Sequence, residues 1–428
     1  MKLYNNFFAV VAFTFTTIIS FAQELGVNLQ IRPRYEYRNG FKELMKDELY
    51  PTSFVSQRSR MSFFFKQEKF KANLSFQNIR VWGDVATTSS SDKNGIAVFE
   101  SWVSYDFNEN WLTKFGRQVL SYDNQRIMGG IDWLQQSQSH DAVLVTNKKN
   151  NYQLDFGAAL NNNNEALYES AYVTNYKNMQ FIWFNQKFSK LNLSFLALNN
   201  GYQYENLNEN KFQVAYLQTF GAYGKWDASK FYGDFGLYVQ TGDVAVINDK
   251  VDVAAYYAGF NLGYKFTAPF KAELGFEYLS GKDQNDSDTK IKSFSPLFGT
   301  NHAFNGLMDY FYVGNHKNTV GLQDVYTKFI FEKNKWQITL APHLFYSAAD
   351  VYSSDTLEIQ ENYMGTEIDL SGSYKMDKNF LISGGISKMF ASSTMEILKG
   401  GNSSNCNNWA WVMVSFAPQL FTYKKINQ

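Results

Sequence analysis

A regular alternation of apolar and polar residues between Val27 and Arg38 constrains the fold more than any other feature of the sequence. Apolar or aromatic residues occupy the odd positions, and polar residues, three of them arginines, occupy the even positions. A period of two residues is that of a β-strand whose two faces meet different surroundings. We therefore interpret this stretch as the first strand of a sheet with one apolar and one polar face.

The same alternation recurs along the chain, and long and short connections follow each other in turn. We expect the long connections at 39–54, 83–96, 122–138, 161–178, 200–210, 242–250, 282–318, 349–362 and 392–406. We expect the short turns at 67–68, 108–110, 147–151, 189–190, 225–230, 267–269, 333–335 and 376–379. Long extracellular loops that alternate with tight periplasmic turns are typical of outer-membrane barrels. The predicted fold is all-β, a transmembrane antiparallel β-barrel of about 18 strands.

The composition agrees with a barrel. Aromatic residues make up 18 % of the chain, yet its mean hydropathy is negative. Barrel strands explain this combination, because lipid-facing and lumen-facing residues alternate and average out. The alternative is a soluble all-β protein such as a lectin-like sandwich or a solenoid. Long strands and a loop rhythm that spans the whole chain are not typical of sandwiches, so we favour the barrel.

The N-terminus has the order of a secretory signal peptide. Lys2 is followed by an apolar run at 7–19 and then by Ser20-Phe21-Ala22. This run is shorter than the roughly 20 residues that a membrane-spanning helix needs. We predict a signal peptide at 1–22 and a single barrel domain at 23–428. The expected location is the outer membrane of a Gram-negative bacterium, surrounded by outer-membrane lipid.

The arginines are concentrated in the first part of a chain whose formal net charge is zero. An arginine on the lipid side at mid-bilayer costs roughly 2 to 4 kcal/mol, so we expect the arginines to face the lumen. Guanidinium groups bind carboxylates in pairs of hydrogen bonds, and rings of cations give pores anion selectivity. The predicted pore-lining residues are Arg32, Arg34, Arg58, Arg60, Arg80, Arg117 and Arg126.

A structural role for these arginines is the alternative. In that case they would pair with acidic residues in a lattice that stiffens the barrel wall. The candidate counter-charges are Glu36, Glu100, Asp132 and Asp141. The zero net charge and the lack of an RNA-binding signature give no reason to expect a nucleic-acid partner.

The most specific stretch is FGRQVLSYDNQRIMGGIDW at 115–133, continued by His140-Asp141-Ala142-Val143. It resembles the alginate export family of outer-membrane porins, whose members carry a GRQ-x-LSY element, an Arg, a Gly, an Asp-Trp pair and a strand opening with Asp-Ala-Val. The matching positions are Gly116, Arg117, Gln118, Leu120, Ser121, Tyr122, Arg126, Gly129 or Gly130, Asp132, Trp133 and Asp141. Segments 34–38 and 80–83 also resemble the family. The resemblance implies a monomeric eighteen-stranded barrel with an arginine-rich constriction that passes an acidic polysaccharide outward.

The loop expected at 282–318 contains FSPLFGTNHAFNGLMDYF at 294–311. Its aromatic density is too high for a freely solvated loop of this length. We expect it to fold into the barrel mouth as a lid or constriction. The alternative is a hairpin extension that packs on neighbouring loops outside the membrane.

Metal-binding and catalytic sites are only weakly indicated by the sequence. Oxygen ligands at Asp283, Asn285, Asp286 and Asp288 have the spacing of a calcium loop but lack its full pattern. The four histidines lack metal-ligand spacing, and Cys406 is the sole cysteine. Consecutive strand residues point to opposite faces, so His140 and its neighbour Asp141 would not converge in a hydrolytic site. We expect no enzyme, no cofactor and no metal.

The sequence therefore predicts an outer-membrane channel, or porin, that passes anionic solutes, among them an acidic polysaccharide such as alginate. A general or small-carboxylate porin on the same scaffold is the first alternative. A surface adhesin that uses its long loops is an alternative of a different class.

Overall fold

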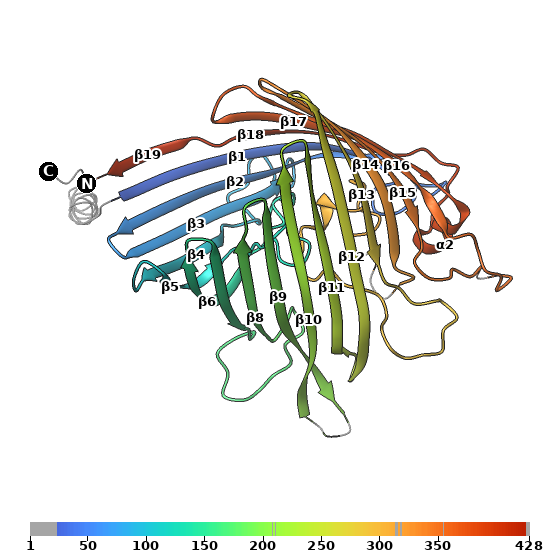
Figure 1. The fold of residues 1–428 in the computed structure, drawn as a ribbon, viewed down its shortest axis with the longest axis horizontal. Coiled ribbons are helices and arrows are strands. Elements are labelled where there is room, and N and C mark those ends of the chain that lie inside the picture. Colours follow the sequence, from blue (N-terminus) through green and yellow to red (C-terminus); the bar gives the residue numbers. More distant parts are fainter. Residues whose placement is uncertain are drawn as a thin grey trace.

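The computed structural model describes residues 24–424 except 208, 210, 313–315, 317–318 and 354, and the expected signal peptide lies outside this range. The regular secondary structure of the described chain consists almost entirely of antiparallel strands (Figure 1). These are β1 (Glu24–Asn39), β2 (Thr52–Gln67), β3 (Phe70–Val81), β4 (Ala97–Asp106), β5 (Trp111–Gln118), β6 (His140–Lys149), β7 (Tyr152–Leu160), β8 (Asn178–Lys187), β9 (Leu191–Asn206), β10 (Lys211–Ala228), β11 (Phe231–Val246), β12 (Asp249–Thr267), β13 (Phe270–Leu279), β14 (Leu322–Lys333), β15 (Trp336–Tyr346), β16 (Tyr363–Lys375), β17 (Phe380–Ala391), β18 (Asn407–Phe416) and β19 (Gln419–Lys424). Two short helices, η1 (Asn301–Ala303) and α2 (Ser393–Lys399), lie in the loops. No helix in the described residues is long and apolar enough to cross a membrane.

The sheet closes on itself through its first strand. β1 pairs with β2 on one side and with β18 and β19 on the other. β18 and β19 are one strand interrupted at Ala417-Pro418, because proline has no N–H to donate to the ladder. The Pro418 carbonyl still accepts a hydrogen bond of 3.1 Å from Leu29 N–H. With these two segments taken as one strand, the predicted closed antiparallel barrel of 18 strands is confirmed.

The connections follow the expected rhythm with two exceptions. All the predicted short turns are confirmed, since a strand ends and the next begins at each of them. The long loops predicted at 200–210 and 242–250 are wrong. There the β9–β10 ladder continues to the pair Asn206 and Lys211, and the β11–β12 ladder to Val246 and Asp249. Both segments are rich in polar residues, but paired strands can continue outside the membrane because their backbone hydrogen bonds stay satisfied.

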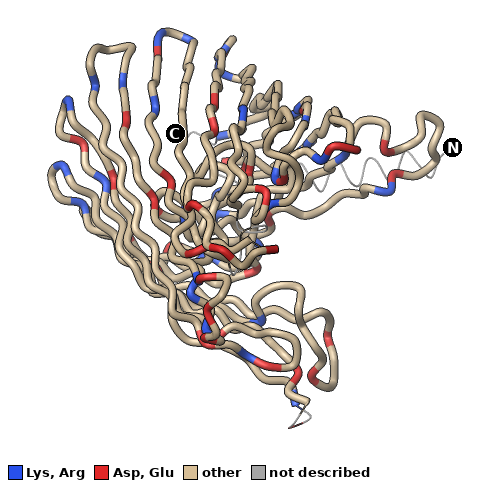
Figure 2. The backbone as a smooth tube through the Cα atoms, turned by 90° about the vertical axis from the view of Figure 1, so that its right-hand side faces the viewer, with Lys and Arg blue, Asp and Glu red and all other residues tan. Residues whose placement is uncertain are grey.

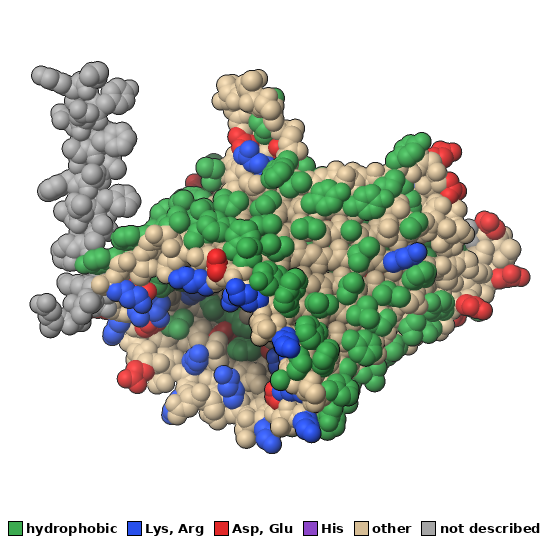
Figure 3. Space-filling model, turned by 90° about the horizontal axis from the view of Figure 1, so that it is seen from above, with side chains coloured by type: hydrophobic (Ala, Val, Ile, Leu, Met, Phe, Trp, Pro, Cys, Tyr) green, Lys and Arg blue, Asp and Glu red, His purple; other side chains and the backbone are tan. Residues whose placement is uncertain are grey.

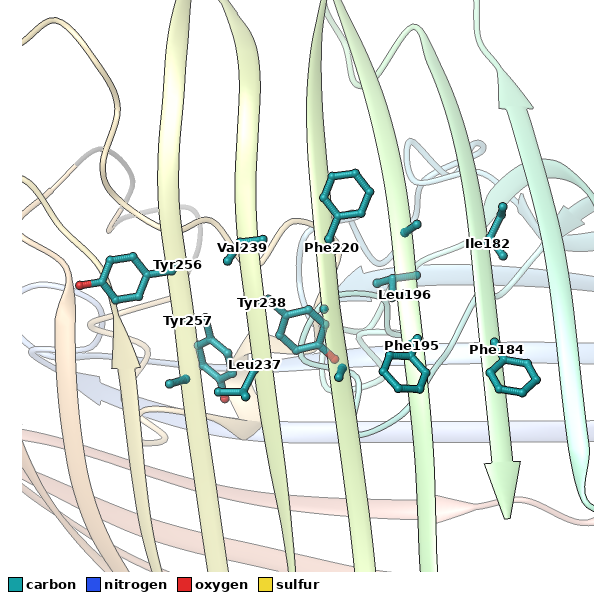
Figure 4. Close-up of a pocket in the computed structure, with 14 residues that line it drawn as sticks. Ile182, Phe184, Phe195, Leu196, Phe220, Leu237, Tyr238, Val239, Tyr256 and Tyr257 are labelled. Atoms are coloured by element: carbon teal, nitrogen blue, oxygen red, sulfur yellow. The ribbon is translucent and has the colours of Figure 1, made fainter. Parts of the chain in front are cut away.

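The outward face of the barrel is apolar (Figure 3). In the wall formed by β8 to β12, Phe195, Phe220 and Leu237 are each about half exposed. They border a shallow hollow of about 750 Å³ in that wall (Figure 4). An apolar band of this kind is what lipid requires of a barrel surface.

On the inward face, aromatic rings lie across glycines of neighbouring strands. Tyr326 of β14 is paired with Gly275 of β13, and Tyr232 of β11 with Gly263 of β12. A Cβ atom added at either glycine would overlap with the ring beside it. Glycine is therefore used here for close approach, and the aromatic ring covers the backbone that the glycine leaves bare.

Two connections fold into the barrel. We call residues 119–139 the first inward loop and residues 291–312 the second inward loop. They meet at a bridge between Met128 and Phe298, and Gln138 of the first donates to the Phe298 carbonyl of the second at 2.9 Å. Residues 291–312 of the loop expected at 282–318 thus lie inside the barrel, as predicted. Asp283 and Gln284 instead hydrogen-bond with Asp350 and Tyr352 of the neighbouring loop, as in the alternative.

Candidate functional site

Strands β1 and β2 place four arginines on the inward face. Arg32 and Arg34 alternate with outward residues of β1, and Arg58 and Arg60 do the same on β2. Arg32 and Arg58 are directly paired across the two strands. Like charges in such a position repel each other, so the wall requires acceptors close by.

The first inward loop supplies these acceptors. The Asp132 carboxylate bridges the two facing arginines, with one oxygen 3.1 Å from Arg32 Nη1 and the other 2.9 Å from Arg58 Nη1. Arg32 also donates to the backbone carbonyl of Leu134 at 3.2 Å. Gln135 accepts a hydrogen bond from Arg32 Nε at 3.2 Å. The loop is therefore fastened to the arginines that were expected to line an open pore.

Arg34 is held by a carboxylate of its own strand. Its Nε donates to Glu36 Oε1 at 2.9 Å, and Arg38 donates to Glu36 Oε2 at 2.8 Å. The Arg34 guanidinium lies 3.9 Å from the ring centroid of Trp133, which is itself stacked on His302. A guanidinium over an indole is a favourable cation–π contact.

Arg60 joins the edge of this cluster, while Arg80 and Arg126 lie elsewhere. Arg60 Nη2 donates to Ser137 Oγ of the first inward loop at 3.2 Å, its Nε donates to Gln77 Oε1 at 3.0 Å, and its guanidinium lies over the Phe99 ring. Arg80 pairs with Asp92 of the loop that follows β3. Arg126 lies on the far side of the lumen, 3.0 Å from Glu277 of β13.

Arg117 and Asp141 require a correction. They pair with each other at 2.7 Å, on the face of β5 and β6 that carries Phe115, a side chain 49 % exposed. By strand alternation this face points outward, so the structure does not place Arg117 in the lumen. The prediction that Arg117 lines the lumen is therefore wrong, because the parity of β5 puts Arg117 on the outward face.

The predicted counter-charges have different roles. Glu36 and Asp132 bind the arginine wall, and Asp141 pairs with Arg117 outside it. Glu100 faces inward but accepts hydrogen bonds from Trp102 Nε1 at 3.0 Å and from Asn73 Nδ2 at 3.3 Å. A lattice of arginines and acids therefore exists, but the inward loop is part of it.

The first inward loop also contacts the opposite wall. Asp123 accepts hydrogen bonds from Trp183 Nε1 of β8 at 3.2 Å and from Ser194 of β9. Burial raises the pKa of the Asp123 carboxyl, and these two hydrogen bonds only partly offset it. Tyr122 donates to Asp155 of β7 at 3.0 Å. Since residues 122–138 contact strands on both sides, the loop crosses the lumen.

The second inward loop covers an acidic wall. Leu307 N–H donates to Asp369 at 3.2 Å, and Met308 N–H donates to Glu367 at 2.8 Å. Asn305 donates to Asp324 at 3.2 Å. These carboxylates lie on β14 and β16, which follow the arginine wall around the sheet on its β18 side, so the second inward loop contacts a wall of opposite charge to that contacted by the first.

Lysines gather at the periplasmic end of the lumen. They occupy inward positions near the short turns, namely Lys66, Lys71, Lys148, Lys187, Lys225, Lys265, Lys271 and Lys375. Lys71, Lys265 and Lys271 pair with acidic residues. Among the described residues the other five have no carboxylate within ion-pair distance. Figure 2 shows cationic segments at the tips of these turns.

These lysines are not among the residues predicted to line the pore. Strand parity predicts their inward position, since Lys66, for example, has the same parity on β2 as the inward Arg58 and Arg60. The extracellular loops, by contrast, are rich in acids such as Glu165, Asp283, Asp350 and Glu358.

The side chains considered as calcium or metal ligands bind other residues of the chain. Lys292 pairs with Asp286 at 2.7 Å and with Asp288 at 3.1 Å. His302 and His343 bind different carboxylates, at Asp309 and Asp324. In the described part of the chain no group of three or more potential ligands is arranged to hold a metal ion.

Comparisons with known proteins agree with this architecture. The model of the family described as Alginate export matches residues 23–403. Among solved structures, the chain is similar to OccAB4 of Acinetobacter baumannii, with a TM-score of 0.63 and 12 % identity over 94 % of this chain and 100 % of that one. It is likewise similar to OccK1 (OpdK) of Pseudomonas aeruginosa, with a TM-score of 0.62 and 10 % identity over the same shares.

A third similar structure is a BenF-like porin from Pseudomonas fluorescens Pf-5, with a TM-score of 0.60 and 11 % identity over 94 % of this chain and 100 % of that one. No curated protein matches the sequence. At these identities the solved structures show the fold alone, and that fold is an outer-membrane porin barrel. With the family match over most of its length, the chain is an outer-membrane channel protein and belongs to the alginate export family.

Proposed function

We propose that this channel conducts anionic solutes, with acidic polysaccharide of the kind named by its family as the main cargo. One observation carries the proposal. Lysines near the periplasmic turns face inward, and five of them have no carboxylate within ion-pair distance among the described residues; further along the lumen lies the arginine wall of β1 and β2, which the first inward loop covers. Cationic side chains that line a low-dielectric lumen concentrate anions and exclude cations.

The distribution of charge along the barrel favours entry from the periplasm. The periplasmic end is rich in lysine, whereas the extracellular loops carry many acids, including Glu165, Asp283 and Glu358. An anion is attracted at the first end and repelled near the second. One closed barrel encloses the whole path, so we propose that a single copy is the working unit.

Planar bilayers test the substrate. We expect an alginate oligosaccharide added on the periplasmic side to interrupt the current through single channels. A neutral maltooligosaccharide of equal length is the control and should leave the current unchanged. Equal interruption by both sugars would contradict an anionic cargo.

A small-carboxylate porin is the second candidate, and the two inward loops favour it because they narrow the lumen. A structure of Pseudomonas aeruginosa OpdK was determined with vanillate. Proteoliposome uptake separates the two candidates. Uptake of glucuronate without uptake of its oligomers would support the small-carboxylate porin.

A further inference from the structure

The side chain of Asp132 is far more exposed to solvent than the two arginines that it binds. The Asp132 side chain is 68 % exposed, whereas the side chains of Arg32 and Arg58 are 5 % and 1 % exposed. The two guanidinium groups are therefore sealed from the lumen, while the carboxylate between them faces lumen water.

The other donors of the two arginines are taken by groups fixed in the fold. Arg58 Nε and Nη2 donate to Gln30 Oε1 at 3.0 and 2.7 Å. Arg32 Nη2 donates to the carbonyl of Leu134 at 3.2 Å. These acceptors are a neighbouring strand residue and a loop backbone, and a solute cannot replace them without moving the fold. The Asp132 carboxylate, by contrast, leaves by rotation of one side chain, which breaks its two ion pairs and the hydrogen bond of 2.9 Å that it accepts from Ser137 Oγ. Arg58 Nη1 keeps its own hydrogen bond of 2.7 Å to Ser137 Oγ.

The backbone around Asp132 is held independently of its carboxylate. Gln135 donates to Ser56 Oγ at 3.1 Å and accepts from Arg32 Nε at 3.2 Å. Trp133 is stacked on His302 with ring centroids 4.2 Å apart. The first inward loop therefore keeps these anchors when the Asp132 side chain rotates away.

We propose that the space between Arg32 and Arg58 is a carboxylate-binding site, and that Asp132 occupies it as an internal ligand which solute carboxylates displace. The proposal rests on the proposed function, because it assumes that anions enter the lumen. Beyond the proposed function, it locates one carboxylate-binding site in the lumen and names Asp132 as the residue that lowers the affinity of that site for solutes. Competition by Asp132 makes every captured carboxylate easier to release, which is what a channel needs for rapid passage.

The protonation of Asp132 agrees with this role. Partial desolvation of the carboxylate by the atoms around it would raise the pKa of Asp132, but Arg58 and Arg32 outweigh this and hold the pKa below its usual value. The residue is therefore an ionised competitor at neutral pH.

Block of single channels by glucuronate tests the proposal, with glucose as the uncharged probe. In Asp132→Asn we expect the half-blocking glucuronate concentration to fall about tenfold, since a hydrogen bond to a charged group is worth roughly that factor in affinity. Removing Arg58 as well, in D132N/R58Q, should abolish the gain. Glucose should not block any of these channels.

Glu100→Gln is the matched control. Glu100 also faces the lumen near this wall, but it binds Trp102 and Asn73 rather than an arginine. A general rise in positive potential would strengthen glucuronate block in E100Q and D132N alike, and that result would overturn the proposal. We expect E100Q to behave as the wild type.

The outcomes separate this inference from the proposed function. A wild-type channel without preference for anions in a salt gradient would refute the proposed function. An anion-selective wild type whose glucuronate block is unchanged or weaker in D132N would refute the internal ligand alone. If D132N does not reach the heat-modifiable folded form on a gel, Asp132→Ser provides the same test with a smaller neutral side chain.

Discussion

Glu36 of the first strand accepts a hydrogen bond of 3.1 Å from Trp409 Nε1 of β18, across the seam where the barrel closes. The same carboxylate binds Arg34 and Arg38, and its side chain is 1 % exposed. One acid thus serves both the closure of the barrel and the arginine wall.

We expect Glu36→Ala to lower the free energy of unfolding by about 3 kcal/mol, because it leaves the buried Arg34 without its carboxylate. Urea unfolding in detergent, followed by tryptophan fluorescence, measures the loss. Glu332→Ala is the control. Glu332 pairs with Lys271 near the periplasmic rim and is 42 % exposed, so its loss should cost at most ~1 kcal/mol. Equal losses in the two variants would contradict the role of Glu36 at the seam.

The pairing of Gly275 with Tyr326 predicts a second stability effect. We expect Gly275→Ala to destabilise the barrel by roughly 1 to 3 kcal/mol, because the new methyl group displaces the Tyr326 ring. Gly26→Ala is the control, since a Cβ there would meet only Gln419 Nε2, at 3.8 Å. The temperature at which each variant loses its heat-modifiable gel form reports the difference. Similar temperatures for the two variants would show that the ring does not depend on the glycine.

Much of the fold could be predicted because, in a barrel strand, every second residue faces lipid and is apolar, whereas the residues between them face the lumen and are mostly polar. The alternation at 27–38 gave the correct strand and the correct inward face for Arg32 and Arg34. Short turns were found because they interrupt this alternation abruptly. The ends of β9 to β12 were missed because a polar strand outside the membrane carries no such contrast.

The site was only partly predictable. Alternation places Arg58 on the inward face, but nothing local to Arg58 shows that Asp132, far along the chain, returns to bind it. The path of an inward loop depends on contacts between distant residues, such as Asp123 with Trp183. Arg117 was misplaced for a simpler reason, since parity within β5 already puts it on the outward face with Phe115.

The contact between Asp132 and the arginines predicts a pH dependence with a definite sign. Its pKa lies below the ordinary value of 3.8, so the ion pairs are intact above that value and are lost as the pH falls through the lowered pKa. We expect the chloride conductance of the wild type to be constant between about pH 8 and 5 and to rise below about pH 4. Asp132→Asn should lack the part of the rise that belongs to this residue. An identical acid response in D132N would argue against this contact.

The position of the second inward loop predicts the effect of its removal. Deleting 290–312 removes Asn305, Leu307 and Met308 from the acidic wall and should increase single-channel conductance. Deleting 86–91, which lies in the largely exposed loop after β3 and leaves the Asp92 partner of Arg80 in place, is the control and should change conductance little. Unchanged conductance after the first deletion would show that the loop does not narrow the path.

The reversal potential of single channels in a potassium chloride gradient tests the central claim most directly. A lumen lined by inward cations predicts a wild-type channel that prefers chloride to potassium. Replacing Lys66, Lys187 and Lys225 together by glutamine should move the reversal potential toward zero. Lys388→Gln, on the outward face over Phe390, should leave it unchanged. A wild-type channel that prefers potassium, or has no preference, would contradict the account.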